Sequence, residues 1–216
     1  LDGNGSQTVN GFTSIVIPVG GGGLVYTNGS NWFITGLGGV PAGKELMYGN
    51  IINGTIVASN AGNAATFALK TLAGAAPSGN DPVLVCFRNP TAATGNYVYR
   101  TIAEARSLTL SSGSTLGAVS ATPLRLWLVL FDAVALDTHT YLGAINCRSG
   151  TNIYPLGQSA RASATAEGGA GGADSAHTFY ASTGLSSLPY AILGYCDYTN
   201  GLATAGTWNV DPTVIQ

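Results

Sequence analysis

Short apolar runs separated by turn-forming residues fill this sequence, and they limit the fold more than any other feature. Runs such as Val83–Arg88 are rich in β-branched and aromatic residues and are bounded by Gly, Asn, Asp, Ser or Pro, which is typical of strands. Asn-Gly pairs recur at 4–5, 10–11, 28–29, 53–54 and 200–201, and both residues of such a pair accept the positive φ of a two-residue hairpin turn. These signals predict an antiparallel all-β fold.

The strands predicted from this pattern are 12–18, 24–27, 32–37, 51–59, 66–71, 83–88, 97–102, 108–110, 125–132, 141–147, 178–181 and 190–198. Residues 61–73 place Ala and Leu at helical spacing, but Thr66 and Phe67 favour a strand there. Residues 159–175 contain AEGGAGGADS, whose glycines carry too high an entropic cost for a regular element. This range is therefore expected to be a long surface loop.

These predictions lead to an antiparallel, jelly-roll-like β-sandwich as the expected architecture. The β-sandwich head covers residues 50–216, and residues 1–49, which contain VGGGGLV and GLGGVPAG, form a short Gly-rich N-terminal stem or attachment segment. A single domain of this size is common among sandwiches. Charged residues make up only 8% of the chain and glycines number 31, a composition that excludes a coiled coil and disfavours a long helical bundle.

The low charge also limits the partners. The chain has 8 Lys+Arg and 10 Asp+Glu, and its basic residues are isolated from one another in the sequence. A groove that follows nucleic-acid phosphates needs clustered basic residues, so no nucleic-acid partner is expected. The densest apolar run, 126–131, is much shorter than the roughly 20 residues of a spanning helix, so no membrane insertion is expected.

The segment RLWLVLFD, residues 125–132, has apolar residues on both faces of its predicted strand. An antiparallel strand with one wet face would alternate, so both faces should be covered. Either another layer of this chain or a neighbouring subunit covers the second face. The low charge favours the subunit, because the centres of interfaces are depleted in charged residues.

Three cysteines, Cys86, Cys147 and Cys196, lie in strand-like apolar contexts. The favoured interpretation is that they are small buried hydrophobic residues. A disulfide, for instance between Cys147 and Cys196, is the alternative. No two cysteines are close enough in sequence to form a C-x-x-C metal or redox pair.

Motifs for catalysis, metal binding or cofactor binding are weak. His139 follows Asp137 and His177 follows Asp174, but no nucleophile-elbow spacing is present. A closed metal site needs three or four ligands, which these pairs do not supply, although a histidine near a threefold axis could bind an ion through three copies. The Gly-rich runs lack the spacing of phosphate-binding loops. No catalytic residue, metal ligand or cofactor is therefore assigned.

Aromatic residues in the polar stretch YCDYTNGLATAGTWN give the candidate binding residues. Tyr195, Tyr198 and Trp208 could stack on sugar rings, and the alternative is that they fill half-buried edges of the fold. The N-x-[ST] triplets at Asn4 and Asn28, like the one at Asn53, are Asn-Gly pairs, so turn formation explains them without glycosylation.

Five segments resemble a known group of proteins: TLSSGSTLG (109–117), TPLRLWLVLFD (122–132), LGAINC (142–147), AEGGAGGADSAHTFY (166–180) and LGYCDYTNGLATAGTWN (193–209). They are similar to a β-rich domain of tail-fibre-like and spike-like structural proteins of tailed bacteriophages and prophages. The resemblance covers roughly residues 50–216 and contains no catalytic motif.

The resemblance implies a non-enzymatic virion structural protein at the surface of the particle. Its expected form is a homotrimer whose head adheres to the host surface, for instance to a glycan, or decorates the capsid. Other virion proteins are expected partners through the N-terminal segment. The alternatives are a carbohydrate-active β-sandwich enzyme, with an acid such as Glu167 or Asp197 acting on polysaccharide, and a cellular lectin or adhesin domain.

Overall fold

The computed structural model describes residues 24–27, 32–35, 51–88, 97–149, 152–153, 156 and 161–216. The chain forms two compact units, Leu1–Tyr48 and Gly49–Gln216, which are described separately. In the first unit, β1 (Leu24–Thr27) and β2 (Trp32–Thr35) form an antiparallel pair. The strand predicted at 12–18 and the Asn-Gly turns before residue 30 lie outside the described residues, as does most of the expected attachment segment.

The described part of the second unit consists of strands and one short helix, α1 (Val134–Asp137), which confirms the all-β class. The strands are β3 (Ile51–Ile52), β4 (Gly54–Ala61), β5 (Ala64–Thr71), β6 (Val83–Arg88), β7 (Tyr97–Ile102), β8 (Arg106–Leu110), β9 (Leu124–Asp132), β10 (Thr140–Asn146), β11 (Arg148–Ser149), β12 (Asn152–Ile153), β13 (Arg161–Ala166), β14 (Phe179–Ala181), β15 (Leu185–Tyr198) and β16 (Val214–Ile215). In the part of the chain that is described, no helix has both the length and the apolar character needed to span a membrane.

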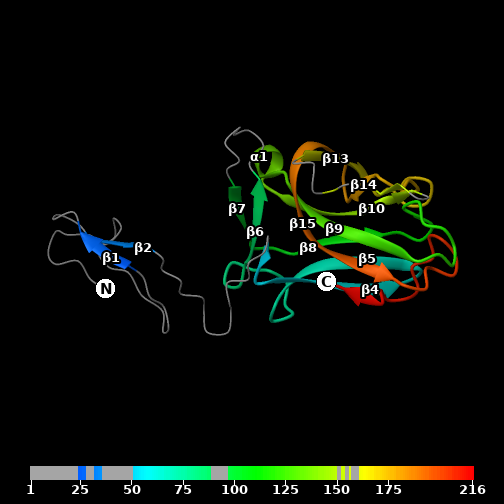
Figure 1. The fold of residues 1–216 in the computed structure, drawn as a ribbon, viewed down its shortest axis with the longest axis horizontal. Coiled ribbons are helices and arrows are strands. Elements are labelled where there is room, and N and C mark those ends of the chain that lie inside the picture. The colour runs from blue at the N-terminus through cyan, green and yellow to red at the C-terminus, as the bar shows by residue number, and fades with distance from the viewer. Residues whose placement is uncertain are drawn as a thin grey trace. The chain divides into compact units, whose positions relative to one another are not determined.

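Three sheets carry most of this unit (Figure 1). The largest has the strand order β13-β14-β10-β9-β15-β16, and the other two have the orders β4-β5-β8 and β3-β6-β7. β11 and β12 form a separate short pair. Figure 1 shows β5 and β8 running along the sheet that contains β9 and β15.

The largest sheet closes on itself through β13. This strand pairs in parallel with β14 and also antiparallel with the start of β15, where Arg161 is opposite Pro189. β15 is 14 residues long, and its later part pairs with β9, where Tyr190 is opposite Phe131. Five strands therefore form a closed ring, β13-β14-β10-β9-β15. The expectation that 159–175 holds no regular element is wrong for Arg161–Ala166, because the glycines begin only at Gly168.

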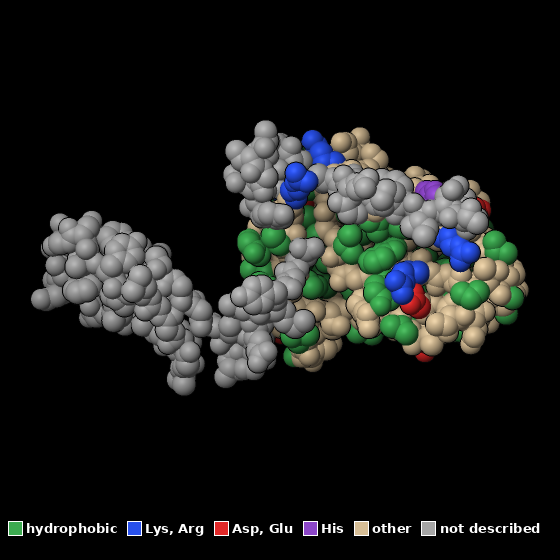
Figure 2. All heavy atoms as spheres, in the orientation of Figure 1, with side chains coloured by type: hydrophobic (Ala, Val, Ile, Leu, Met, Phe, Trp, Pro, Cys, Tyr) green, Lys and Arg blue, Asp and Glu red, His purple; other side chains and the backbone are tan. Residues whose placement is uncertain are grey.

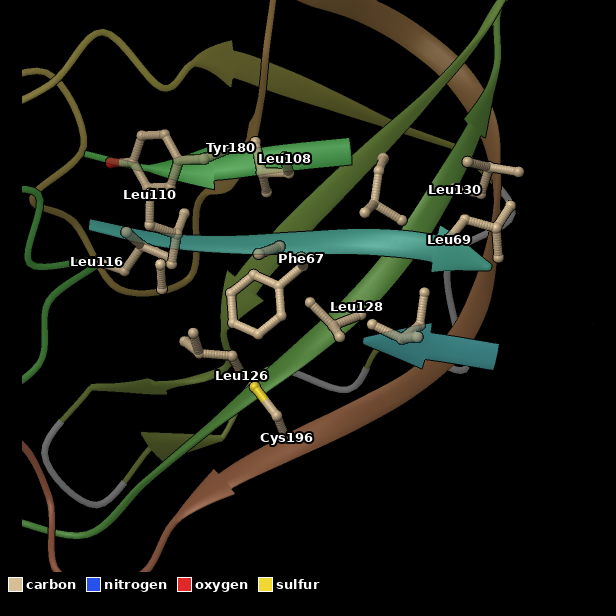
Figure 3. Close-up of a cluster of buried hydrophobic side chains, with 14 of the residues drawn as sticks. Phe67, Leu69, Leu108, Leu110, Leu116, Leu126, Leu128, Leu130, Tyr180 and Cys196 are labelled. Carbon is tan, nitrogen blue, oxygen red and sulfur yellow. The ribbon is translucent and has the colours of Figure 1, made fainter. Parts of the chain in front are cut away.

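The two faces of β9 belong to two separate hydrophobic clusters. Leu126, Leu128 and Leu130 belong to the first, which β5, β6 and β8 complete, and Figure 3 shows Phe67 of β5 beside Leu126 and Leu128. Val129 and Phe131 belong to the second, inside the closed ring, and both are fully buried. The prediction that both faces are covered is confirmed. The chain's own ring covers the second face, so the inference that a neighbouring subunit does so is wrong.

The second cluster is centred on three aromatic rings. Phe131 meets Phe179 edge to face, with centroids 5.6 Å apart, and Phe179 and Tyr190 are 5.1 Å apart. The Tyr190 hydroxyl donates a hydrogen bond of 2.7 Å to the Leu156 carbonyl, so its polar tip is satisfied inside the cluster. Such aromatic pairs stabilise a core beyond their buried area.

The hairpin turns differ from the sequence prediction in one instructive way. The two-residue turn between β4 and β5 is Gly62-Asn63, with φ angles of 57° and 64°, so the order of the pair is reversed. Asn53 also has a positive φ of 60°, but it connects two strands of different sheets instead of forming a hairpin. Its side-chain amide is buried and donates to Asp81 and to the Pro82 carbonyl at 2.8 Å, so it is closed to glycosylation.

The three cysteines are free thiols. Cys196 lies in the first cluster and Cys147 in the second, on opposite faces of the same sheet, which rules out the alternative of a disulfide between them. Burial raises the pKa of Cys147 to about 11 and the pKa of Cys196 to about 12. Both therefore remain protonated at neutral pH and act as small apolar side chains.

Candidate functional site

Two of the three candidate glycan contacts lie inside the protein. Trp208 is fully buried and Tyr198 is 2% exposed, and their rings pack against each other with centroids 5.6 Å apart. The Trp208 indole N–H donates to the Ser114 carbonyl at 2.8 Å. Neither ring can present a face to a sugar, so the prediction is wrong for Tyr198 and Trp208.

Tyr195 is half-buried, and its ring is already occupied by neighbours. It lies opposite Trp127 in the β15–β9 pair, with ring centroids 5.3 Å apart. The Arg125 guanidinium lies 3.7 Å from the centre of the Tyr195 ring, within the range of a cation–π interaction. The hydroxyl of Tyr195 donates to the Gln216 side chain. Stacking of a ligand on Tyr195 would have to displace Arg125.

Arg125 is held on this surface by Asp197, its cross-strand partner. Its Nε and Nη2 donate to the two carboxylate oxygens at 2.6 and 2.7 Å, which is a bidentate arrangement. The hydrogen bonds from Arg125 lower the pKa of Asp197, and the same contact raises the pKa of Arg125. We call Arg125, Trp127, Tyr195 and Asp197 the closed surface cluster, because its charges and ring faces are paired internally.

Glu167, one of the acids considered for catalysis, is a structural residue. Its carboxylate is buried and accepts hydrogen bonds from both the backbone N–H and the hydroxyl of Ser111, at 2.7 and 2.9 Å. Ser114 Oγ and the Gly169 N–H donate to it at 2.5 and 3.2 Å. The carboxylate thereby joins residues 111–114 to the start of the Gly-rich loop, and these four donors engage both of its oxygens.

The Gly-rich loop after Glu167 is fixed at a second point by Asp174. Its carboxylate accepts hydrogen bonds from the backbone N–H of Thr115 and of Gly171, both at 2.9 Å, and these bonds lower its pKa. Gly117 approaches the backbone of Ala176 so closely that a Cβ there would lie 2.3 Å from the Ala176 nitrogen. Two of the five resembling segments, 109–117 and 166–180, thus meet in one packed junction.

The histidine considered for catalysis at position 139 lies at the surface beside Asp137. Its Nδ1 is 3.7 Å from Oδ1 of Asp137, and the other carboxylate oxygen, Oδ2, accepts a hydrogen bond from the Tyr141 hydroxyl. The bond from Tyr141 is the main cause of the lowered pKa of Asp137 and raises the pKa of Tyr141. Among the described residues, His139 makes no hydrogen bond to a serine, threonine or cysteine that it could activate.

An open cavity of about 320 Å³ lies where β6 and β7 meet α1 and the β13–β15 pair, and we call it the α1 hollow. Three arginines line it, Arg88, Arg100 and Arg161, together with Asp132. Apolar side chains, among them Phe87, Leu136 and Leu188, form the rest of its wall. Figure 2 shows basic side chains near α1 and β13.

The charged groups of the α1 hollow are only partly paired. Arg100 Nε donates to Asp132 Oδ2 at 2.9 Å, and the Asp132 side chain is 7% exposed. The other Asp132 oxygen accepts from the Val134 N–H at the start of α1. Arg161 Nε donates to the Ser187 carbonyl at 2.8 Å. Within the described residues, Arg88 and the terminal nitrogens of Arg100 make no hydrogen bond, so they can receive an anionic group.

This hollow was missed by sequence reasoning because its residues are spread from Phe87 to Pro189 and form no motif. No group of three or more His, Cys, Asp or Glu side chains that could hold a metal ion occurs in the part of the chain that is described. Comparisons with protein-family models, with curated proteins and with solved structures found no match to this chain.

Proposed function

We propose that this chain is a non-enzymatic structural protein of a tailed-phage virion, a fibre-like or spike-like head displayed at the virion surface as a homotrimer. In this proposal the head adheres to the host surface or decorates the particle, and the N-terminal segment attaches it to other virion proteins. The five resembling segments support the assignment to this group of virion proteins. The α1 hollow supports the adhesive function.

The observation that carries adhesion is the α1 hollow. It is an open cavity on a scaffold of paired strands, and it places arginine donors next to apolar side chains. Binding sites commonly combine an apolar wall with a few oriented polar groups. Many weak contacts of this kind, repeated in a trimer, give strong attachment through high effective concentration.

The proposed β-sandwich is supported by the first hydrophobic cluster. Side chains of β5 and β8 pack there against side chains of β9, so two layers of sheet share one core (Figure 3). The ring closed by β13 is an addition to a plain two-layer sandwich.

The proposed homotrimer is supported by apolar side chains that remain at the surface. Val119 is 64% exposed, Tyr99 61% and Leu72 53%. In a chain with 8% charged residues, a symmetric assembly that covers part of this surface would reduce its exposure to water. β9 no longer contributes to this argument, since its second face is buried in the chain itself.

Two measurements test the proposal. Size-exclusion chromatography with light scattering at micromolar concentration should give the mass of a trimer, and a stable monomer would overturn the homotrimer. Incubation with capsular polysaccharide or lipopolysaccharide should give binding without release of oligosaccharides. Released oligosaccharides would overturn the non-enzymatic assignment in favour of a carbohydrate-active enzyme.

A further inference from the structure

We infer that the α1 hollow binds the carboxylate of an acidic sugar residue in a surface polysaccharide, an inference that rests on the proposed adhesive function and names its ligand class. Surface polysaccharides carry their negative charge either as carboxylates or as phosphates. The hollow favours a carboxylate attached directly to the sugar ring.

The first argument is the concentration of positive charge. Three of the chain's eight basic residues line this one hollow, although the chain as a whole has a net charge of −2. The one acid in the lining, Asp132, is already neutralised by Arg100. Arg88, an exposed arginine that makes no ion pair within the described residues, therefore leaves a positive balance in the hollow, which attracts an anion.

The second argument is the set of unused donors. Arg100 uses only Nε on Asp132, so its planar fork keeps two terminal nitrogens for a ligand. Asp132 fixes the direction of this fork, because its carboxylate is itself held by the Val134 N–H. An arginine fork of this kind binds a carboxylate through two parallel hydrogen bonds.

The third argument is the apolar wall beside these donors. Ala135 and Leu136, which are exposed, and Val98, which is partly exposed, line the same space as the arginines, and the buried Phe87 lies behind them. The C–H face of a sugar ring can pack on such a wall while a carboxylate on that ring reaches the arginines. A phosphodiester separates its charge from the ring and uses this combination less well.

A second cavity, of about 460 Å³, gives the polysaccharide a path beyond the first sugar. Arg100 lines both cavities, and the second also contains Arg106, Thr101 and Thr138. Its lining offers hydroxyl groups to the hydroxyls of a neighbouring sugar residue. Arg106 is engaged with Glu104 and Thr140, so Arg100 is the charged residue that connects the two cavities.

The test uses matched polymers and the full chain. Polygalacturonate and polysialic acid supply ring carboxylates, the methyl ester of polygalacturonate removes the charge at constant backbone, and poly(glycerol phosphate) supplies phosphate. Isothermal titration calorimetry should show binding to the two carboxylated polymers and at least about tenfold weaker binding to the ester, the equivalent of one lost charge-assisted hydrogen bond.

Arg88→Ala is the main variant, because the side chain is exposed and its loss should leave the fold intact. It should weaken binding to polygalacturonate about tenfold. Arg148→Ala, at an exposed arginine outside both cavities, is the matched control and should change binding less than twofold. Arg100→Lys is a second variant that keeps the charge but removes the fork, and it should also weaken binding.

Equal binding of the acid and ester forms, an unchanged affinity of Arg88→Ala, or binding to poly(glycerol phosphate) alone would overturn the inference. If neutral polysaccharides bind and Arg88→Ala has no effect, adhesion stands and this ligand class is wrong. If a polymer is cleaved, the non-enzymatic function is wrong, and the acid–ester comparison still decides whether the hollow recognises carboxylates.

Discussion

Two arginine–aspartate pairs in this protein contain the same two residue types but differ in their hydrogen-bond geometry. In the pair Arg125–Asp197, two nitrogens of the guanidinium bind both oxygens of the carboxylate, and a tyrosine ring covers the guanidinium. In the pair Arg100–Asp132, one nitrogen binds one oxygen, and the rest of the guanidinium faces the α1 hollow. The first pair is complete in itself, whereas the second is available for a ligand.

Strand register explains the difference. Arg125 and Asp197 are direct cross-strand partners in the β9–β15 pair, so their side chains lie side by side on one face. Arg100 lies on β7 and Asp132 at the end of β9, in different sheets. No strand pairing aligns Arg100 with Asp132, because the two residues lie in different sheets. The terminal nitrogens of Arg100 are therefore left without a hydrogen bond to Asp132. Incomplete pairs between sheets are therefore the better places to look for binding.

The largest expected effect comes from a buried carboxylate that needs no arginine at all. Glu167→Gln replaces one acceptor oxygen by an NH₂ group that faces the donors of Ser111 or Ser114. We expect a loss of about 3 kcal/mol in the free energy of unfolding, measured by urea denaturation. Glu104→Gln, at an exposed side chain paired with Arg106, is the control and should shift the transition much less. Similar transitions for both variants would contradict a structural role for Glu167.

Asp132→Ala is expected to have the next largest effect. It leaves Arg100, whose side chain is 31% exposed, without its counter-charge, and it leaves the Val134 N–H without an acceptor. We expect a loss of about 2 kcal/mol by the same measurement. The matched variant Asp197→Ala should cost less than about 1 kcal/mol. An equal loss in the two variants would remove the distinction between the pairs.

Arg125→Ala should have a small effect on stability, below about 1 kcal/mol, since the side chain is 44% exposed. It should instead free the Tyr195 ring, which the guanidinium now covers. Quenching of tyrosine and tryptophan fluorescence by acrylamide should increase relative to the wild type. Unchanged quenching would mean that other groups shield Tyr195.

The smallest effect is the pH dependence of the complete pair. The pKa of Asp197 is lowered in the folded protein, so its contribution is present above the unfolded value near 3.9 and is lost as the pH falls through the lowered folded pKa. The stability difference between wild type and Asp197→Asn should therefore stay constant between pH 7 and about pH 4 and shrink below it. A difference that persists unchanged at pH 2 would contradict the assigned charge pairing.

Most strands could be predicted because their apolar runs are short and sharply bounded. The ranges 83–88 and 97–102 match β6 and β7 residue for residue. β13 escaped detection because RASATA has no large apolar residue and lies next to a glycine-rich stretch. The closure of the ring could not be read from the sequence, since it depends on a pairing between β13 and β15 across the Gly-rich loop. The closed ring is what covers the second face of β9, which carries Val129 and Phe131.

The candidate site could be predicted less well, although one signal was available. Along β15, alternation places Cys196 and Tyr198 on the buried side, with Tyr195 and Asp197 on the other. Applied to YCDY, period two would have removed Tyr198 from the candidate glycan contacts. Trp208 offers no such signal, because it lies in an irregular segment. The α1 hollow depends on three distant parts of the chain, and only the folded structure brings their arginines together.

The placement of the two buried thiols gives this fold a built-in pair of reporters. Cys147 and Cys196 lie in different clusters on opposite faces of one sheet, and their raised pKa values keep both unreactive while the clusters stay packed. A thiol reagent can therefore modify each one only when its own half of the core opens. The two labelling rates, compared in one sample, would tell whether the ring and the layered core open together or one at a time.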